Sequence, residues 1–155
     1  MNKNFDTAIL KKIQLDIFKC VIDICKKHDI CYFCFGGTAL GAVRHSGFIP
    51  WDDDIDIAMK RKDYEKFAQV AKSELPNYYF LQNYKTDPDF RLQFAKIRDS
   101  RTTFIETSGR NLSINHGVYI DLFILDGYPN DNKKANKLYR LNRLTRGYCA
   151  KDDVS

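Results

Sequence analysis

Long apolar segments are missing from the sequence. No stretch reaches the 18 consecutive apolar residues that indicate a membrane-spanning helix. The first residues also lack the basic region and unbroken apolar run of a secretory signal. We therefore expect a cytoplasmic protein.

Cysteines are few and odd in number. The 155 residues include five Cys, which is typical of a reducing compartment and not of a disulfide-stapled domain. Cys31 and Cys34 form the one closely spaced pair, but zinc or redox use would need a second ligand pair or a thioredoxin-like setting. Because neither is present, we interpret both as thiols of the core.

The composition is that of a folded protein. Hydrophobic residues make up 44%, charged residues 29% and aromatic residues 14%. We expect a single domain over residues 1–155, because this length does not comfortably hold two. The net charge of +5 favours anionic partners and leaves phosphates, nucleic acid and lipid headgroups open.

Hydrophobic periodicity predicts both helices and strands. Apolar residues at spacings of three and four predict helices over about 6–28, 63–75 and 131–146. Short runs of β-branched and aromatic residues predict strands. The remaining expected elements are strands over 31–35, the second half of 51–59, 78–82, 90–98, 102–106 and 118–125, and a short helix over 38–44. The predicted fold class is α/β, in the broad sense that includes α+β.

Two aspartates are predicted to lie side by side. Alternate side chains of a strand share a face, so Asp54 and Asp56 point to the same side. Unpaired carboxylates this close repel each other, and a divalent cation between them removes the repulsion. Mg²⁺ is the expected ion, because it prefers oxygen and commonly binds one or two carboxylates plus substrate phosphates.

Two other interpretations of this acidic segment are weaker. Asp52, Asp54, Asp56 and Asp63 match positions one, three, five and twelve of an EF-hand loop, but position six is Ile57 where that loop needs glycine. A solvated acidic loop is disfavoured by the apolar residues that flank and interrupt the segment.

A glycine pair precedes the aspartates. Gly36 and Gly37 follow a predicted strand, and Thr38 opens a predicted helix, which is the outline of a phosphate cradle. A Gly-Gly pair alone is usually a turn, but one leading to Asp-x-Asp on a strand is more specific. Asp121, inside the apolar strand 118–125, is the predicted third carboxylate, which completes the metal site or takes a proton from the acceptor.

Four basic residues are candidates for binding the donor phosphates. Arg44 and His45 follow the short predicted helix, and Lys96 and Arg98 alternate on a predicted strand. Each of them has an equal claim to be an ordinary surface charge.

The predicted last helix has an apolar side and a basic periodicity. Its leucines, Leu138, Leu141 and Leu144, need a partner such as the sheet edge or the remainder of a longer protein. Basic residues recur at intervals of three: Lys134, Lys137, Arg140, Arg143 and Arg146. This spacing is weak support for nucleic acid, which we do not expect as a partner. A peripheral contact with anionic lipid at the inner face of the membrane is the alternative.

The segment GGTALGAVRHSGFIPWDDDIDIAM, followed by RKDYEKF, closely resembles the LicD family of phosphocholine transferases, which is related to fukutin and fukutin-related protein. The segments KIRDSRTTFIE and HGVYIDLFILDGYP resemble further blocks of the family in the expected order, so the resemblance runs from about residue 27 to 129. It implies a nucleotidyltransferase fold like that of DNA polymerase beta, in which helices flank a mixed sheet.

The resemblance also implies an activity. The segment 36–38 would hold the donor phosphates, and Asp54, Asp56 and Asp121 would bind Mg²⁺. Phosphocholine would pass from CDP-choline to a hydroxyl of a cell-surface glycan, such as lipopolysaccharide or teichoic acid, and CMP would leave. Relatives resemble enzymes that use CDP-ribitol or CDP-glycerol. The alcohol, the acceptor and whether the acceptor is lipid-linked therefore stay open.

Length leaves one alternative function. Members of the family are generally longer, so we expect a chain truncated at its C-terminus. A truncated or non-catalytic module that binds nucleotide or glycan phosphates is the competing hypothesis. The three aspartates argue against it, because a phosphate-binding module gains nothing from carboxylates unless a metal joins them.

Overall fold

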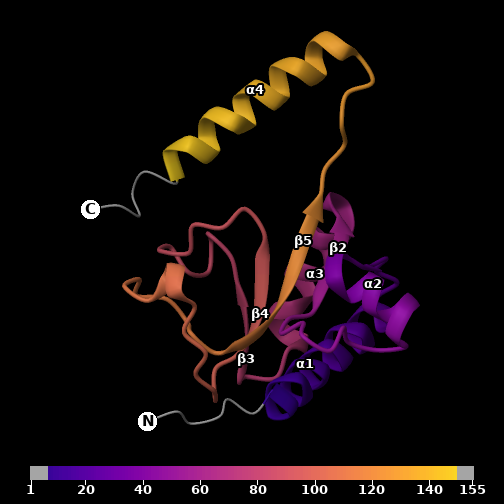
Figure 1. The fold of residues 1–155 in the computed structure, drawn as a ribbon, viewed down its shortest axis with the longest axis vertical. Helices are drawn as coiled ribbons and strands as arrows, with labels where there is room; N and C mark the ends of the chain where they lie inside the picture. Colours follow the sequence, from indigo (N-terminus) through magenta and orange to yellow (C-terminus); the bar gives the residue numbers. More distant parts are fainter. Residues whose placement is uncertain (1–6, 150–155) are drawn as a thin grey trace. The chain divides into compact units, whose positions relative to one another are not determined.

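The computed structural model describes residues 7–149, and side chains as far as residue 143 (Figure 1). The chain divides into two compact units, Met1–Leu125 and Asp126–Ser155. The first unit holds a sheet and three α-helices, and the second holds α4.

A five-stranded mixed sheet organises the first unit. Its order is β1-β2-β5-β4-β3, in which β2 and β5 are parallel and the other neighbours are antiparallel. The predicted α/β class is confirmed. The strands are β1 (Phe33–Cys34), β2 (Asp56–Lys60), β3 (Tyr79–Gln82), β4 (Ala95–Asp99) and β5 (Val118–Leu125).

Two helices cover one face of this sheet. The helix α1 (Thr7–Lys27) contacts β4 and β5, and α3 (Arg61–Glu74) contacts β2 and β5. Each of these helices carries an apolar stripe at helical spacing. Every second residue of the strands points towards them, which leaves the intervening residues for the opposite face. The resulting core includes Ile17, Val21, Ile24, Ile57, Met59, Phe67, Ala71, Ile97, Ile120 and Leu122.

Two of the predicted strands differ from the structure. The strand predicted over 102–106 is absent, and this segment leads into a 3₁₀ turn at Thr107–Gly109. It is joined to the sheet by side chains: Thr102 Oγ1 accepts the Val118 N–H, and Glu106 accepts from Arg98. The strand predicted over 90–98 begins only at Ala95. Before it, Asp87 accepts hydrogen bonds from Gln82 Nε2 and the Asn115 N–H, which fixes a turn there.

The expectation that Cys31 and Cys34 are core thiols is wrong. Both are free and exposed, whereas Cys25 of α1 is buried. The apolar run of residues 31–35 supplies only the two-residue edge strand β1, which pairs with β2 on one side. An edge strand outside the helix layer buries little of its surface.

The second unit contains the predicted C-terminal helix as α4 (Asn132–Cys149). Asp131 Oδ1 accepts the Lys134 N–H at 2.8 Å, which is the N-cap bond of this helix. Within this unit Leu141 is exposed, and the side chains of Leu144 and Arg146 lie outside the described residues. None of the helices between residues 7 and 149 is long and apolar enough to cross a membrane.

Candidate active site

Strand register aligns three charged side chains across the sheet. Asp121 of β5 lies opposite Asp56 of β2 on one side and opposite Lys96 of β4 on the other. Asp54 precedes β2 by two residues, and carboxylate oxygens of Asp54, Asp56 and Asp121 lie within 4.8 Å of one another. The structure therefore brings together the three predicted acids, which we call the acidic group.

The start of α2 (Gly36–His45) lies against this group. Gly36 has φ +51°, and a Cβ there would lie 2.6 Å from Asp56 Oδ2. A Cβ on Gly37 would collide with Asp52 Oδ2. Thr38 Oγ1 accepts the backbone N–H of Asp56 at 2.7 Å, which holds β2 against the helix. Glycine is required here because any larger residue would displace a carboxylate.

This helix start is suited to an anion. The first N–H groups of a helix lack intrahelical acceptors and carry partial positive charge. The helix is preceded by Phe35, whose side chain makes no capping hydrogen bond. The Gly37 N–H donates to the Asp56 carboxylate, and the other N–H groups of this turn are suited to phosphate oxygens.

Burial and neighbouring negative charges raise the pKa values of the acidic group. Burial, followed by the charge of Asp56, raises the pKa of Asp54 to about 6. Burial also raises the pKa of Asp121 to about 6, although Lys96 acts in the opposite direction. The pKa of Asp56 is raised by burial and by Asp52, against a hydrogen bond from Gly37. Without a cation, Asp54 and Asp121 therefore lose their protons only as the pH rises through about 6.

The donor set fits Mg²⁺. All three ligand groups are carboxylates, which supply the oxygen atoms that this ion prefers. Asp121 Oδ1 is buried without a hydrogen-bond partner, although Lys96 Nζ lies 2.9 Å away as an ion pair. A second acidic set, Asp52–Asp54, is also close enough to share a cation, but its Asp53 is exposed. The set of Asp54, Asp56 and Asp121 is less exposed and is the better metal site.

The raised pKa values predict how stability depends on pH. A carboxyl whose folded pKa is about 6 and whose reference value is 3.8 stabilises the fold below pH 3.8 and loses that contribution as pH rises through 6. Without metal, the parent should therefore lose thermal stability between about pH 4 and pH 6. Asp54→Asn removes one of these carboxyls, so its melting temperature should fall less over the same pH range. The difference should be roughly 2–4 °C for each kcal/mol of pH-dependent stability that the substitution removes. Thermal scans in EDTA measure the difference, and equal slopes would contradict it.

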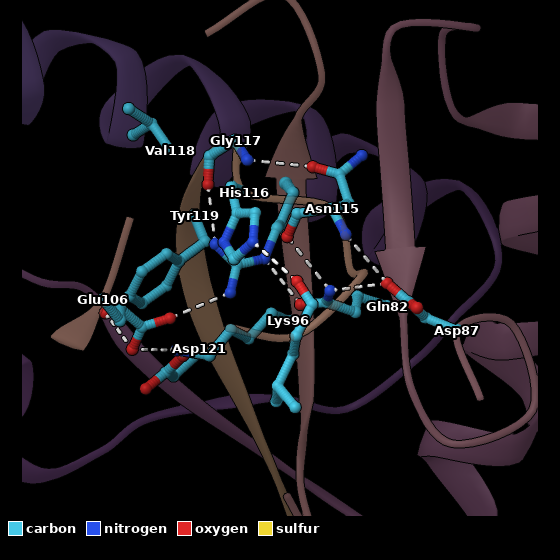
Figure 2. A network of polar contacts seen from close by, with 12 residues as sticks. Gln82, Asp87, Lys96, Glu106, Asn115, His116, Gly117, Val118, Tyr119 and Asp121 are labelled. Atoms are coloured by element: carbon cyan, nitrogen blue, oxygen red, sulfur yellow. Dashed lines mark hydrogen bonds and ion pairs between the residues drawn. The ribbon is translucent and has the colours of Figure 1, made fainter. Parts of the chain in front are cut away.

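Lys96 and Arg98 are buried and belong to one polar network through Glu106. Figure 2 shows Lys96, Glu106 and Asp121 of this network. Lys96 Nζ lies 3.2 Å from Glu106 Oε1 as well as 2.9 Å from Asp121 Oδ1. Arg98 donates to Gln82 Oε1 at 2.5 Å, to the Gly117 carbonyl at 2.8 Å and to Glu106 Oε2 at 2.9 Å. A phosphate contact from Arg98 would break these bonds, so we assign it to support of the site.

Arg98→Met should destabilise the fold. Arg98 is 1% exposed, and removing it leaves the carboxylate of Glu106 and the amide of Gln82 with fewer partners. We expect a loss of about 3 kcal/mol in the free energy of unfolding, at the lower end for a broken buried ion pair. Urea unfolding measures it. Arg110→Met, at an exposed position, should change stability by less than about 0.5 kcal/mol, and an equal loss in both variants would contradict this role.

Arg44 and His45 lie at the other end of α2. Both are exposed, and the helix axis separates them from Gly37 by roughly 12 Å at 1.5 Å per residue. The His45 ring lies 6.4 Å from the Trp51 ring. The structure therefore does not bring these two residues to the acidic group, and their contact with donor phosphate stays a prediction.

Sequence reasoning missed the carboxylate of Glu106 and its partner Tyr119. Glu106 accepts from Tyr119 Oη at 2.9 Å as well as from Lys96 and Arg98. Burial opposes its ionisation, but Lys96 and these hydrogen bonds hold the pKa of Glu106 below its usual value. Strand alternation places Tyr119 on the face of Asp121, whereas no sequence pattern relates Glu106 to that face.

An aromatic row, also missed, continues from Asp121. Phe123 lies two residues along β5, stacks on Phe94 at 4.7 Å and contacts the Phe35 ring at 5.1 Å. Phe94 also lines a cavity of about 1060 Å³ between α3, β3 and the loop after β3. The row thus supplies aromatic surface next to the acidic group.

Comparison with known proteins agrees with this geometry. The family model for the LicD/FKTN/FKRP nucleotidyltransferase domain matches residues 29–143, which include the start of α2 and all three acids. The chain belongs to the LicD family.

The sequence similarity to bacterial relatives covers most of this chain, whereas the similarity to a mammalian relative covers about a third of it. The lipopolysaccharide cholinephosphotransferase LicD of Haemophilus influenzae is 40% identical over 77% of this chain and 44% of its own length. An uncharacterised protein of Rickettsia typhi is 31% identical over 90% of this chain and 42% of its own length. The human ribitol 5-phosphate transferase FKRP is 33% identical over 35% of this chain and 11% of its own length. The chain thus spans less than half of the LicD relatives it matches.

Proposed function

We propose that the chain is the catalytic core of a Mg²⁺-dependent transferase. It moves phosphocholine, or a similar phospho-alcohol, from a CDP-linked donor to a hydroxyl of a cell-surface glycan. The observation that carries the proposal is that the carboxylates of Asp54, Asp56 and Asp121 lie together beside the start of α2. Family membership supports it, because LicD of H. influenzae is a cholinephosphotransferase.

Each part of the site has a role in this reaction. Asp54, Asp56 and Asp121 hold the ion, which supplies positive charge to the phosphoryl oxygens. The backbone N–H groups at the start of α2 bind and orient the donor phosphates. The acceptor hydroxyl oxygen forms the new bond to phosphorus while its proton passes to a carboxylate of the acidic group, for which Asp121 is the candidate; the bond from phosphorus to the CMP oxygen breaks, and CMP leaves. The protein holds the donor phosphate and the acceptor hydroxyl in line, and this alignment contributes a large part of the rate enhancement.

An aromatic surface beside the acidic group is suited to the organic parts of the donor. The aromatic row of Phe35, Phe94 and Phe123 presents rings beside Asp121. Such rings stack on a nucleobase or attract a quaternary ammonium group. This surface is consistent with either the cytosine or the choline end of CDP-choline.

A second candidate is a module that binds the donor and metal without turnover. The chain spans less than half of the length of the relatives it matches, so turnover by the whole protein is a proposal. This candidate shares the metal and phosphate sites and differs only in the absence of product.

A donor panel separates the two candidates. The chain is incubated with Mg²⁺, a glycan extract and labelled CDP-choline, CDP-ribitol or CDP-glycerol. We expect label on the glycan with one donor and only with metal. If donor and metal bind but no label transfers, the binding module is correct and the transferase proposal is wrong for this chain.

A further inference from the structure

Three buried or half-buried charges adjoin Asp121 of the acidic group, those of Lys96, Arg98 and Glu106. Figure 2 shows Lys96 and Glu106 beside Asp121. Lys96 pairs with Asp121 and Glu106, and Arg98 pairs with Glu106. Lys96 and Arg98 are each 1% exposed, so both positive charges are withdrawn from water. Two cations thus face two carboxylates, and this charge network is neutral as a whole.

Lys96 has no capacity left for a substrate. Its ammonium lies 2.9 Å from Asp121 Oδ1, 3.2 Å from Glu106 Oε1 and 3.3 Å from the centre of the Tyr119 ring. An ammonium group has three N–H donors, and two carboxylates and a ring face occupy the space around them. Lys96 can therefore act on the reaction only through its neighbours.

The neutral network leaves a defined charge on the remainder of the site. Asp54 and Asp56 form no ion pair among the residues that the structure describes. Together they carry two negative charges when ionised, which is the charge that one divalent ion balances. With Asp121 already balanced by Lys96, a second ion at the acidic group would leave excess positive charge in a partly buried site. The neighbouring Asp52 and Asp53 belong to the more exposed set described above, so this count applies to the acidic group alone.

We propose that Lys96 and Glu106 set the charge of the acidic group so that it holds one divalent ion in the absence of donor. Lys96 is a positioning residue. It holds the Asp121 carboxylate between Asp56 and Lys96, and its positive charge weakens the attraction of that carboxylate for the ion. Glu106 is held by hydrogen bonds from Arg98 and Tyr119 and forms an ion pair with Lys96. Its negative charge offsets part of the Lys96 charge and so restores part of the attraction between Asp121 and the ion. The inference rests on the metal site of the proposed function.

Opposite changes in ion affinity follow from this arrangement. Lys96→Met removes a positive charge next to a metal ligand, so the ion should bind more tightly. Glu106→Gln keeps the size of the side chain and removes a negative charge, so the ion should bind less tightly. Charges a few ångströms apart at a partly buried site interact by more than 1 kcal/mol, so each shift should reach about 10-fold.

The test uses the full chain and Mn²⁺ alone, with no nucleotide, at pH 8. Electron paramagnetic resonance of free Mn²⁺ gives the number of ions bound and their affinity, and near-ultraviolet circular dichroism checks that each variant is folded. The control is Lys72→Met, which removes an exposed charge from α3.

We expect one tightly bound ion in the parent, tighter binding in Lys96→Met, weaker binding in Glu106→Gln and no change in Lys72→Met. If the parent binds no Mn²⁺, the metal site of the proposed function is itself wrong. If the parent binds two ions, or if the two variants shift affinity in the same direction or not at all, the charge-setting role is wrong and the metal site stands. The conservative Glu106→Gln keeps the outcome decisive if Lys96→Met does not fold.

Discussion

Asp121→Asn is expected to lower the transfer rate by roughly 10²–10⁴-fold without unfolding the protein. Asp121 lies between Asp56 and Lys96 in the strand register, and its oxygen belongs to the acidic group. Asparagine keeps the shape but removes the charge that attracts the ion. It also leaves the buried ammonium of Lys96 facing a neutral amide. Rates of CMP release over a range of Mg²⁺ concentrations separate loss of metal binding from loss of turnover.

A matched control distinguishes this effect from a general change in charge. Asp89→Asn removes an exposed carboxylate from the loop before β4 and should keep the parent's rate and metal dependence. A parent-like rate in Asp121→Asn would mean that two aspartates suffice and that the third has no part in the reaction.

Gly36→Ala should lower the rate by about 10²-fold or more, because a displacement near 1 Å at a reacting centre has this effect. The φ of +51° costs a non-glycine residue about 1–2 kcal/mol. The new Cβ would lie 2.6 Å from Asp56 Oδ2, so the carboxylate or the helix start must move. Metal affinity should fall with the rate, since the same carboxylate binds the ion. Mn²⁺ titration and CMP release on one preparation test both.

Gly47→Ala is the control for this substitution. A Cβ at Gly47 meets no atom within 4 Å, and its φ is not positive. The variant should match the parent in rate and in metal affinity. If Gly36→Ala also matched the parent, the close contact between the start of α2 and Asp56 would have no functional importance.

The acidic group was predictable because its determinants are local. Alternation along a strand puts Asp54 and Asp56 on one face, and the charge of Asp121 inside an apolar strand demands a partner. Glycines at the start of a helix likewise indicate an anion site from adjacent residues. The structure brings these segments together through the parallel pairing of β2 and β5. What the sequence leaves unspecified is this pairing, which joins residues more than 60 positions apart.

Long-range register explains what was not predicted. Alternation correctly puts Lys96 and Arg98 on one face of their strand, but only the order β2-β5-β4 places Lys96 beside Asp121. Glu106 reaches the network from a segment predicted as a strand. Its position depends on a loop held by side-chain bonds, which no periodicity reports.

Edge strands are a further limit of pattern reasoning. A short apolar run such as 31–35 predicts burial whether the strand is central or at the edge. The structure places β1 at the edge, and this exposes Cys31 and Cys34. Composition cannot distinguish the two cases, because both use the same residue types.

Release of CMP from CDP-choline, with a glycan extract and Mg²⁺, tests the central claim most directly when the parent and Asp56→Asn are compared. Asp56 contacts both halves of the site, because its carboxylate belongs to the acidic group and its backbone N–H donates to Thr38. We predict metal-dependent CMP release by the parent, none in EDTA and none by Asp56→Asn. Equal CMP release by the parent and the variant, or release that persists in EDTA, would contradict a transferase that works through a metal held by these aspartates.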